Sequence, residues 1–308
     1  MNSVAWKAYA KINLGLTVLG RRPDGYHELR TVYQSIGLAD HLEVTLQAGP
    51  RRVHLETSGL AVPEGSQNLA VRAAEAMLEE LHLRAHVSVV LHKRIPLGSG
   101  LGGGSSDAAT VLRAISNLSK QMVTAERLLR MAAELGSDVP FFLYGGRALG
   151  LGRGEEVYPL PEEQRRCCVL FFPGRGMDTV EAYRRLRRPR LTPLAASPTI
   201  ELFSSRVNEA RGNRWSGPGH HGLENDFEPL VFREFPGLAR VKETLRQAGA
   251  EVATLSGSGS AVFGLFQNYS TARRAAQQLR GQSGRVVLTR TISRREFQAQ
   301  SVRPKAAR

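Results

Sequence analysis

A glycine-rich segment at residues 96–109 constrains the fold more than any other part of the sequence. It joins a predicted strand that ends near His92 to a predicted helix that contains Ala108, Leu112 and Ile115. Because glycine has no Cβ atom, the backbone of such a loop can come close to a phosphate, and the helix N-terminus adds about half a positive charge. A flexible linker is the other interpretation, but ordered elements are predicted on both sides. We therefore predict a phosphate-binding loop, which is not a Walker A loop because no lysine precedes Ser105.

Three polar residues follow the glycines, and their roles stay undecided at this level. Ser105 or Ser106 could cap the helix, bind a phosphate or ligate Mg²⁺. Asp107 could bind the metal or complement the helix dipole. A carboxylate repels phosphates unless a cation lies between them, which favours the metal reading of Asp107 no more than the dipole reading, and the ligands of any Mg²⁺ stay unassigned.

The remaining pattern predicts an α+β fold with two domains. Alternating polar and apolar residues over 11–18 predict a half-buried strand that places Lys11 and Asn13 on one face. From residue 165 the predicted elements follow the order β-α-β-β-α-β, with a long insertion after the first helix. We expect a first domain at 1–164, a second at 165–292 with its insertion at about 187–222, and a basic tail at 293–308. The insertion and the tail have compositions typical of disorder.

Composition limits the classes of partner and the compartment. The 308 residues carry 42 basic and 28 acidic side chains, and the net charge of +14 favours an anionic partner. No aromatic residues alternate with the arginines at 184–190, so we read that cluster as a solvated face and expect no nucleic acid. The sequence has neither a secretory signal nor an apolar run of membrane length, which predicts a cytoplasmic protein without a membrane partner. Cys167 and Cys168 are adjacent in a predicted strand and point to opposite faces, so they form neither a disulfide nor a chelate.

Two further segments carry candidate site residues. The segment 256–260 alternates serine and glycine between two predicted strands, and it is either a hairpin turn or a second ligand loop. Asp138 precedes Val139-Pro140, where a helix is predicted to begin, and it is either a helix cap or a general base. A general base there needs a nearby cation, for which Lys11 is the candidate.

Taken together, these segments resemble the GHMP kinase superfamily. The resemblance covers about residues 5–290 and is carried by the motifs at 10–14, 23–29, 100–109 and 136–141. It implies an ATP-dependent kinase that uses Mg²⁺, with a first domain like the second domain of ribosomal protein S5 and a ferredoxin-like second domain. The four motifs are most similar to the branch that phosphorylates the 2-hydroxyl of a methylerythritol carrying cytidine diphosphate, in the non-mevalonate isoprenoid pathway.

The same resemblance assigns roles to individual residues. It makes Asp138 the base that takes the proton of the acceptor hydroxyl and Lys11 the cation that orients that hydroxyl. Cytosine is expected to stack on Tyr26 and Tyr183, with His27 at the edge of the base. The acceptor is further expected to contact Asn13, Thr179, Gly257, Ser258 and Gly259. The expected ATP-binding residues are Pro96, Gly98, Ser99, Gly100, Leu101, Gly102, Gly103, Gly104, Ser105 and Ser106, with Asn68 and Lys93 on the adenine side.

Two alternatives stay open. Another GHMP kinase, for homoserine, mevalonate or a sugar, would keep the loops and lose the site at Tyr26 and His27. An RNA-binding protein would account for the positive charge and the S5-like domain, but not for the glycine loops. The sequence is compatible with a monomer and with a homodimer.

Overall fold

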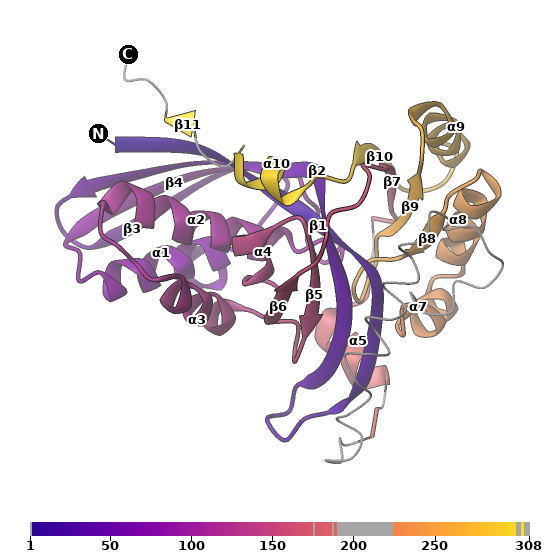
Figure 1. Cartoon of the computed structure of the whole chain (residues 1–308), viewed down its shortest axis with the longest axis horizontal. Helices are drawn as coiled ribbons and strands as arrows, with labels where there is room; N and C mark the ends of the chain where they lie inside the picture. Colours follow the sequence, from indigo (N-terminus) through magenta and orange to yellow (C-terminus); the bar gives the residue numbers. More distant parts are fainter. Residues whose placement is uncertain (1, 175, 187, 190–223, 300–302, 305–308) are drawn as a thin grey trace.

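The computed structural model describes residues 2–174, 176–186, 188–189, 224–299 and 303–304, and it contains two β-sheets with helices packed on them (Figure 1). The insertion expected at 187–222 lies outside the described residues except for 188 and 189. Within the described part of the chain, no helix has the length and apolar character needed to cross a membrane.

The first sheet has strand order β11-β1-β2-β4-β3, and β5 extends it by pairing with β2 and β6. Its neighbouring strands are antiparallel except for β3 and β4, which are parallel. Helices α1 to α4 lie together on one side of this sheet in Figure 1, and the largest hydrophobic core fills the space between them. The elements are β1 (Asn2–Arg21), β2 (His27–Ala48), β3 (Arg52–Gly59), the short helix η1 (Gly65–Gln67), α1 (Leu69–Glu80), β4 (Ala85–Lys93), α2 (Gly103–Ser119), α3 (Ala125–Leu135), α4 (Phe141–Tyr144), β5 (Arg147–Leu151), β6 (Glu156–Pro159) and β11 (Arg303–Pro304).

The second sheet is antiparallel with the order β10-β7-β9-β8. The predicted succession of strands and helices is found here, with an additional short helix, α7, before α8. Helices α7, α8 and α9 lie on the outer side of the sheet in Figure 1. The elements are β7 (Cys167–Phe172), α5 (Thr179–Leu186), α7 (Glu228–Glu234), α8 (Pro236–Gln247), β8 (Val252–Leu255), β9 (Val262–Phe266), α9 (Tyr269–Leu279) and β10 (Arg285–Arg290).

A long hairpin of β1 and β2 connects the two parts. The two strands have 20 and 22 residues and are much longer than the segment 11–18 in which the sequence alternates. β1 is buried without interruption from Ala8 to Leu16, and a strand buried on both faces shows little alternation. Leu16 and Val18 in its lower half pack into the hydrophobic core of the second part, and the Leu16 N–H donates to the Glu224 carbonyl at 3.0 Å. The Val18 N–H donates to Asp226 Oδ2 at 2.8 Å. The hairpin therefore contributes one wall to any cleft between the sheets.

The tail after residue 293 is partly ordered, which corrects the expectation of disorder there. Residues Arg294–Ala299 form helix α10, and its one large apolar side chain, Phe297, is only 4% exposed. The Phe297 ring packs on the ring of Tyr9, with the centroids 5.6 Å apart. A single buried aromatic residue in a basic segment is too short a pattern for sequence analysis to detect.

Candidate active site

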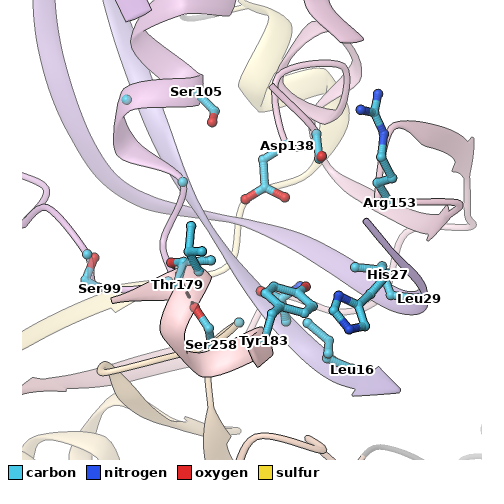
Figure 2. Close-up of a pocket in the computed structure, with 18 of the residues that line it drawn as sticks. Leu16, His27, Leu29, Ser99, Ser105, Asp138, Arg153, Thr179, Tyr183 and Ser258 are labelled. Carbon is cyan, nitrogen blue, oxygen red and sulfur yellow. Dashed lines mark hydrogen bonds between the residues drawn. The ribbon is translucent and has the colours of Figure 1, made fainter. Parts of the chain in front are cut away.

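A cavity of about 950 Å³ lies where the hairpin, the glycine loop, α5 and the loop 256–260 meet (Figure 2). Most of the residues predicted to bind ATP or the acceptor line it. They are Lys11, Asn13, Tyr26, His27, Pro96, Gly98, Ser99, Gly100, Gly102, Gly103, Gly104, Ser105, Asp138, Thr179, Tyr183, Gly257 and Ser258.

The glycine loop leads into α2, and Gly102 is the N-cap residue with φ of 69°. Neither Ser105 nor Ser106 caps the helix, which removes one of the roles considered for them. The Ser106 hydroxyl donates to the Tyr9 carbonyl at 2.7 Å and is buried, whereas Ser105 lines the cavity. Leu101 is buried in the core beneath the loop. The first turn of α2 thus presents backbone N–H groups and one serine hydroxyl to the cavity.

The loop 256–260 packs directly against the glycine loop. Gly100 has φ of +76°, and a Cβ atom there would overlap the Ser256 carbonyl, so glycine is needed for this approach. The Ser256 hydroxyl donates to the Gly100 carbonyl at 3.0 Å, and the Asn13 N–H donates to that hydroxyl at 3.3 Å. Gly257 and Ser258 reach the cavity, while Gly259 is not part of its lining. Three segments far apart in sequence therefore form one continuous wall.

Lys11 and Asp138 face each other at the centre of the cavity. Lys11 Nζ lies 3.2 Å from Asp138 Oδ2 and donates to Asn13 Oδ1 at 2.6 Å. The Lys11 side chain is 3% exposed and that of Asp138 is 31% exposed. The helix after this segment, α4, has Pro140 as its N-cap residue, so Asp138 is not a helix cap. The geometry is that of a carboxylate open to a ligand and held beside a buried ammonium group.

Tyr33 on β2 is a site residue that sequence analysis missed. Its hydroxyl donates to Asp138 Oδ1 at 3.0 Å, so Asp138 has a different partner on each oxygen. Burial, followed by the charge of Asp138, raises the pKa of Tyr33 well above its ordinary value. The hydroxyl therefore keeps its proton and acts as a donor. The pairing of β2 with β5 sets this position, and sequence periodicity contains no signal for it.

Aromatic rings form the end of the cavity away from the glycine loop. In Figure 2 the His27 ring lies against the Tyr183 ring, with centroids 5.0 Å apart and planes 28° apart. Tyr26 at the hairpin tip is 53% exposed, and the Arg153 guanidinium lies 4.6 Å from its ring centroid. Burial, then the charge of Arg21, lowers the pKa of His27, so its ring is neutral at pH 7. The Thr179 and Ser258 hydroxyls are 3.1 Å apart across the floor of this end.

Four arginines of the cavity wall were not identified as site residues from the sequence. Arg184 and Arg188 belong to the cluster that we read as a solvated face, and they are indeed 74% and 36% exposed. They line the cavity nevertheless, together with Arg21 and Arg153. Among the described residues of the lining, Asp138 is the one carboxylate. The cavity therefore suits an anionic ligand.

Asn68 and Lys93, expected on the adenine side, are not part of the lining. Asn68 is the N-cap of α1 and accepts the Ala70 N–H at 2.9 Å. Lys93 Nζ donates to the carboxylates of Asp40 and Asp107 and is 1% exposed. Both side chains therefore form hydrogen bonds with other groups of the protein.

The candidates for a metal site do not assemble into one. Ser106 is bonded to the backbone of β1, Asp107 is bonded to Lys93, and Ser105 alone of the three lines the cavity. Within the described part of the chain, no three His, Cys, Asp or Glu side chains lie around one point where they could hold a metal ion. The one carboxylate of the described lining, Asp138, is already paired with Lys11 and Tyr33. The protein groups described here therefore do not form a Mg²⁺ site of their own.

Known protein families match both parts of the chain. The GHMP kinases N terminal domain matches residues 68–146, and the GHMP kinases C terminal domain matches residues 207–284. A 4-diphosphocytidyl-2-C-methyl-D-erythritol kinase of Solibacter usitatus (strain Ellin6076) is 43% identical over 273 residues, 89% of this chain and 84% of the relative. One of Moorella thermoacetica (strain ATCC 39073 / JCM 9320) is 43% identical over 293 residues, 95% of this chain and 100% of the relative.

Solved structures of kinases are similar to this chain as well. The crystal structure of a 4-(cytidine 5'-diphospho)-2C-methyl-D-erythritol kinase has a TM-score of 0.73 at 40% identity and covers 93% of this chain and 98% of that one. A homoserine kinase from Cytophaga hutchinsonii ATCC 33406 has a TM-score of 0.72 at 21% identity, covering 95% of each chain, and so supports the fold alone. The expected superfamily and its two-domain α+β fold are confirmed. This chain belongs to the GHMP kinases, in the family of the 4-diphosphocytidyl-2-C-methyl-D-erythritol kinases.

Proposed function

We propose that this ATP-dependent kinase phosphorylates the 2-hydroxyl of 4-diphosphocytidyl-2-C-methyl-D-erythritol, a step of the non-mevalonate route to isoprenoid precursors. One observation carries the assignment of the reacting groups. The Lys11–Asp138 pair lies in a single cavity that has the glycine loop at one end and the aromatic rings at the other (Figure 2). A donor with phosphates and an acceptor with a flat base would meet at this pair.

Asp138 acts as the general base and Lys11 as the orienting cation. The Asp138 carboxylate takes the proton of the acceptor hydroxyl as its oxygen forms a bond to the γ-phosphorus and the bond from that phosphorus to the β-phosphate oxygen breaks. Lys11 attracts the developing alkoxide. Asn13, bonded to Lys11 at 2.6 Å, keeps the ammonium group pointing at the reacting oxygen. Phosphoryl transfer needs little more of the side chains than position and charge.

The glycine loop and the start of α2 hold the phosphates of ATP. Their backbone N–H groups and the Ser105 hydroxyl are the donors exposed to the cavity. Mg²⁺ enters with ATP as part of the substrate, bound mainly by the nucleotide phosphates. It neutralises the charge of those phosphates.

The aromatic end binds the cytidine diphosphate of the acceptor. The rings of Tyr26 and Tyr183 offer flat surfaces for cytosine, and the neutral His27 offers hydrogen bonds to its edge. Arg21 and Arg153 supply positive charge for the diphosphate. Both substrates are water-soluble phosphate esters, so we assign the reaction to the cytoplasm, with neither membrane nor nucleic acid as a partner.

A coupled ADP-release assay tests this function. The natural protein is given ATP and Mg²⁺ with the cytidine diphosphate substrate, and in parallel with mevalonate and with homoserine. We expect turnover with the first acceptor and none with the other two. Turnover on mevalonate or homoserine alone would reassign the substrate within the GHMP kinases. Salt-sensitive RNA binding without any ATP turnover would replace the proposal with the RNA-binding alternative.

A further inference from the structure

A second lysine–aspartate site lies next to the glycine loop and outside the cavity. Lys93 Nζ donates to Asp40 Oδ2 and to Asp107 Oδ2, at 2.6 Å in each case. The side chains of Lys93, Asp40 and Asp107 are 1%, 0% and 4% exposed. We call these three residues the buried triad.

The buried triad joins the two ends of the glycine loop. At the start of the loop, Asp40 Oδ1 accepts the backbone N–H groups of Arg94 at 2.6 Å and Ile95 at 2.8 Å. At its end, Asp107 lies near the beginning of α2. Lys93 links the two carboxylates, so the triad closes the base of the loop.

The charge of the triad lies close to the cavity wall. A Cβ atom on Gly103 would be 3.0 Å from Lys93 Nζ, and Gly103 itself lines the cavity. The backbone of this glycine therefore has the ammonium group near one side and the cavity on the other. Two carboxylates and one ammonium group leave one negative charge uncompensated when all three are ionised. Asp107 Oδ1 is buried and has no hydrogen-bond partner among the described residues.

We propose that the buried triad sets the affinity of the glycine loop for ATP, by fixing the shape of the loop and through its net charge. This inference rests on the proposed function, because it requires ATP phosphates at the loop. Asp40, Lys93 and Asp107 are then positioning residues that act through the backbone of the loop and touch neither substrate. A negative charge beneath a phosphate site weakens binding, and the low dielectric of the interior screens that charge poorly.

A role of the charge and a role of the contact alone predict different ATP affinities for one conservative variant. Asp107→Asn keeps the size of the side chain and an acceptor for Lys93, but it removes the surplus negative charge. If contact alone matters, this variant binds ATP no better than the natural protein. If the charge matters as well, it binds ATP more tightly. Lys93→Met has the reverse effect, because it leaves two carboxylates without their ammonium group.

The experiment is isothermal titration of a non-hydrolysable ATP analogue with Mg²⁺, at pH 8. It compares the natural protein, Asp107→Asn, Lys93→Met and the control Glu79→Gln, which removes a charge from a residue that is 79% exposed. We expect the Kd of Asp107→Asn to fall by about threefold to tenfold and that of Lys93→Met to rise at least about tenfold. The control changes Kd by less than about twofold, because water and salt screen its charge. The KM for the acceptor stays near the natural value in every variant.

The outcomes separate failure of this inference from failure of the proposed function. A Kd for Asp107→Asn that is equal to or higher than the natural one overturns the role of charge. This variant decides the question even where Lys93→Met is too unstable to measure, because its volume and its bond to Lys93 are retained. A natural protein that binds no ATP analogue would instead contradict the proposed function itself.

Discussion

Two lysine–aspartate sites touch neighbouring glycines of the same loop, yet they have opposite properties. Lys11 lies against Gly102 and faces Asp138, which is 31% exposed to the cavity. Lys93 lies against Gly103 and is sealed between two carboxylates that are at most 4% exposed. A carboxylate that a substrate can reach can exchange a proton with it, whereas a sealed one can only hold its neighbours. Access to the cavity, rather than residue type, decides whether a lysine–aspartate site can take part in the reaction or can only position its neighbours.

The largest expected effect is on the stability of the sealed site. Lys93→Met leaves Asp40 and Asp107 buried without their cation, so we expect the free energy of unfolding to fall by about 3–5 kcal/mol. Lys11→Met is the matched variant at the open site. Its partner Asp138 stays hydrated and bonded to Tyr33, so the loss should be about 1 kcal/mol. Urea unfolding measures both, and equal losses would remove the distinction between the sites.

For turnover, the variant at the open site, Lys11→Met, should show the larger effect. Lys11→Met removes the cation that orients the acceptor hydroxyl, so we expect kcat to fall about 100-fold while the KM for ATP changes little. The measurement is steady-state ADP release with each substrate varied in turn. A rise in the KM for ATP at an unchanged kcat would assign Lys11 to nucleotide binding instead.

The pH dependence of stability should report on the sealed site. Burial raises the pKa of Asp107 from 3.8 to about 7, and the charge of Lys93 opposes the rise. The folded state therefore holds a proton that the unfolded state releases at lower pH. We expect the free energy of unfolding of the natural protein to fall relative to that of Asp107→Asn as the pH rises from about 4 to about 7. This fall should be smaller than the loss of unfolding free energy in Lys93→Met, because the natural protein retains the ammonium group. Urea unfolding across this range checks the sign, and a parallel course of the two proteins contradicts it.

The smallest expected effect concerns the second partner of Asp138. Tyr33→Phe removes one hydrogen bond of 3.0 Å and keeps the ring. A single hydrogen bond is worth about 1 kcal/mol, so kcat should fall about fivefold, with both KM values nearly unchanged. A fall as large as that of Lys11→Met would make the Tyr33 hydroxyl a direct participant in proton transfer.

Local sequence patterns predicted the loops and the open site, because each loop and each residue of that site lies in a short motif. The glycines at 98–104 indicated close backbone approach. The polar face of the first strand predicted Lys11, and the segment before Pro140 predicted Asp138. The resemblance to the GHMP kinases then joined segments that periodicity could not bring together.

The parts that the sequence did not reveal depend on packing between distant segments. The role of Tyr33 follows from the pairing of β2 with β5, and that of Arg153 from the turn between β5 and β6 that reaches Tyr26. Lys93 and Asp107 looked like ligands of ATP or a metal, because no local pattern shows that Asp40 lies between the strand end and the helix. A residue's exposure is a property of the folded chain, and the two lysine–aspartate sites differ mainly in the exposure of their carboxylates.

The most direct test of the central claim is turnover per folded, ATP-saturated molecule in Asp138→Asn and in Lys93→Met. The folded fraction comes from unfolding curves, and ATP is raised well above the Kd of each variant. We expect Asp138→Asn to lose about 1,000-fold in kcat, because the general base is gone. Lys93→Met should keep kcat within about threefold once it is folded and saturated, since a positioning residue acts on binding. Comparable losses of kcat in the two variants would contradict the separation of a chemical site from a positioning site.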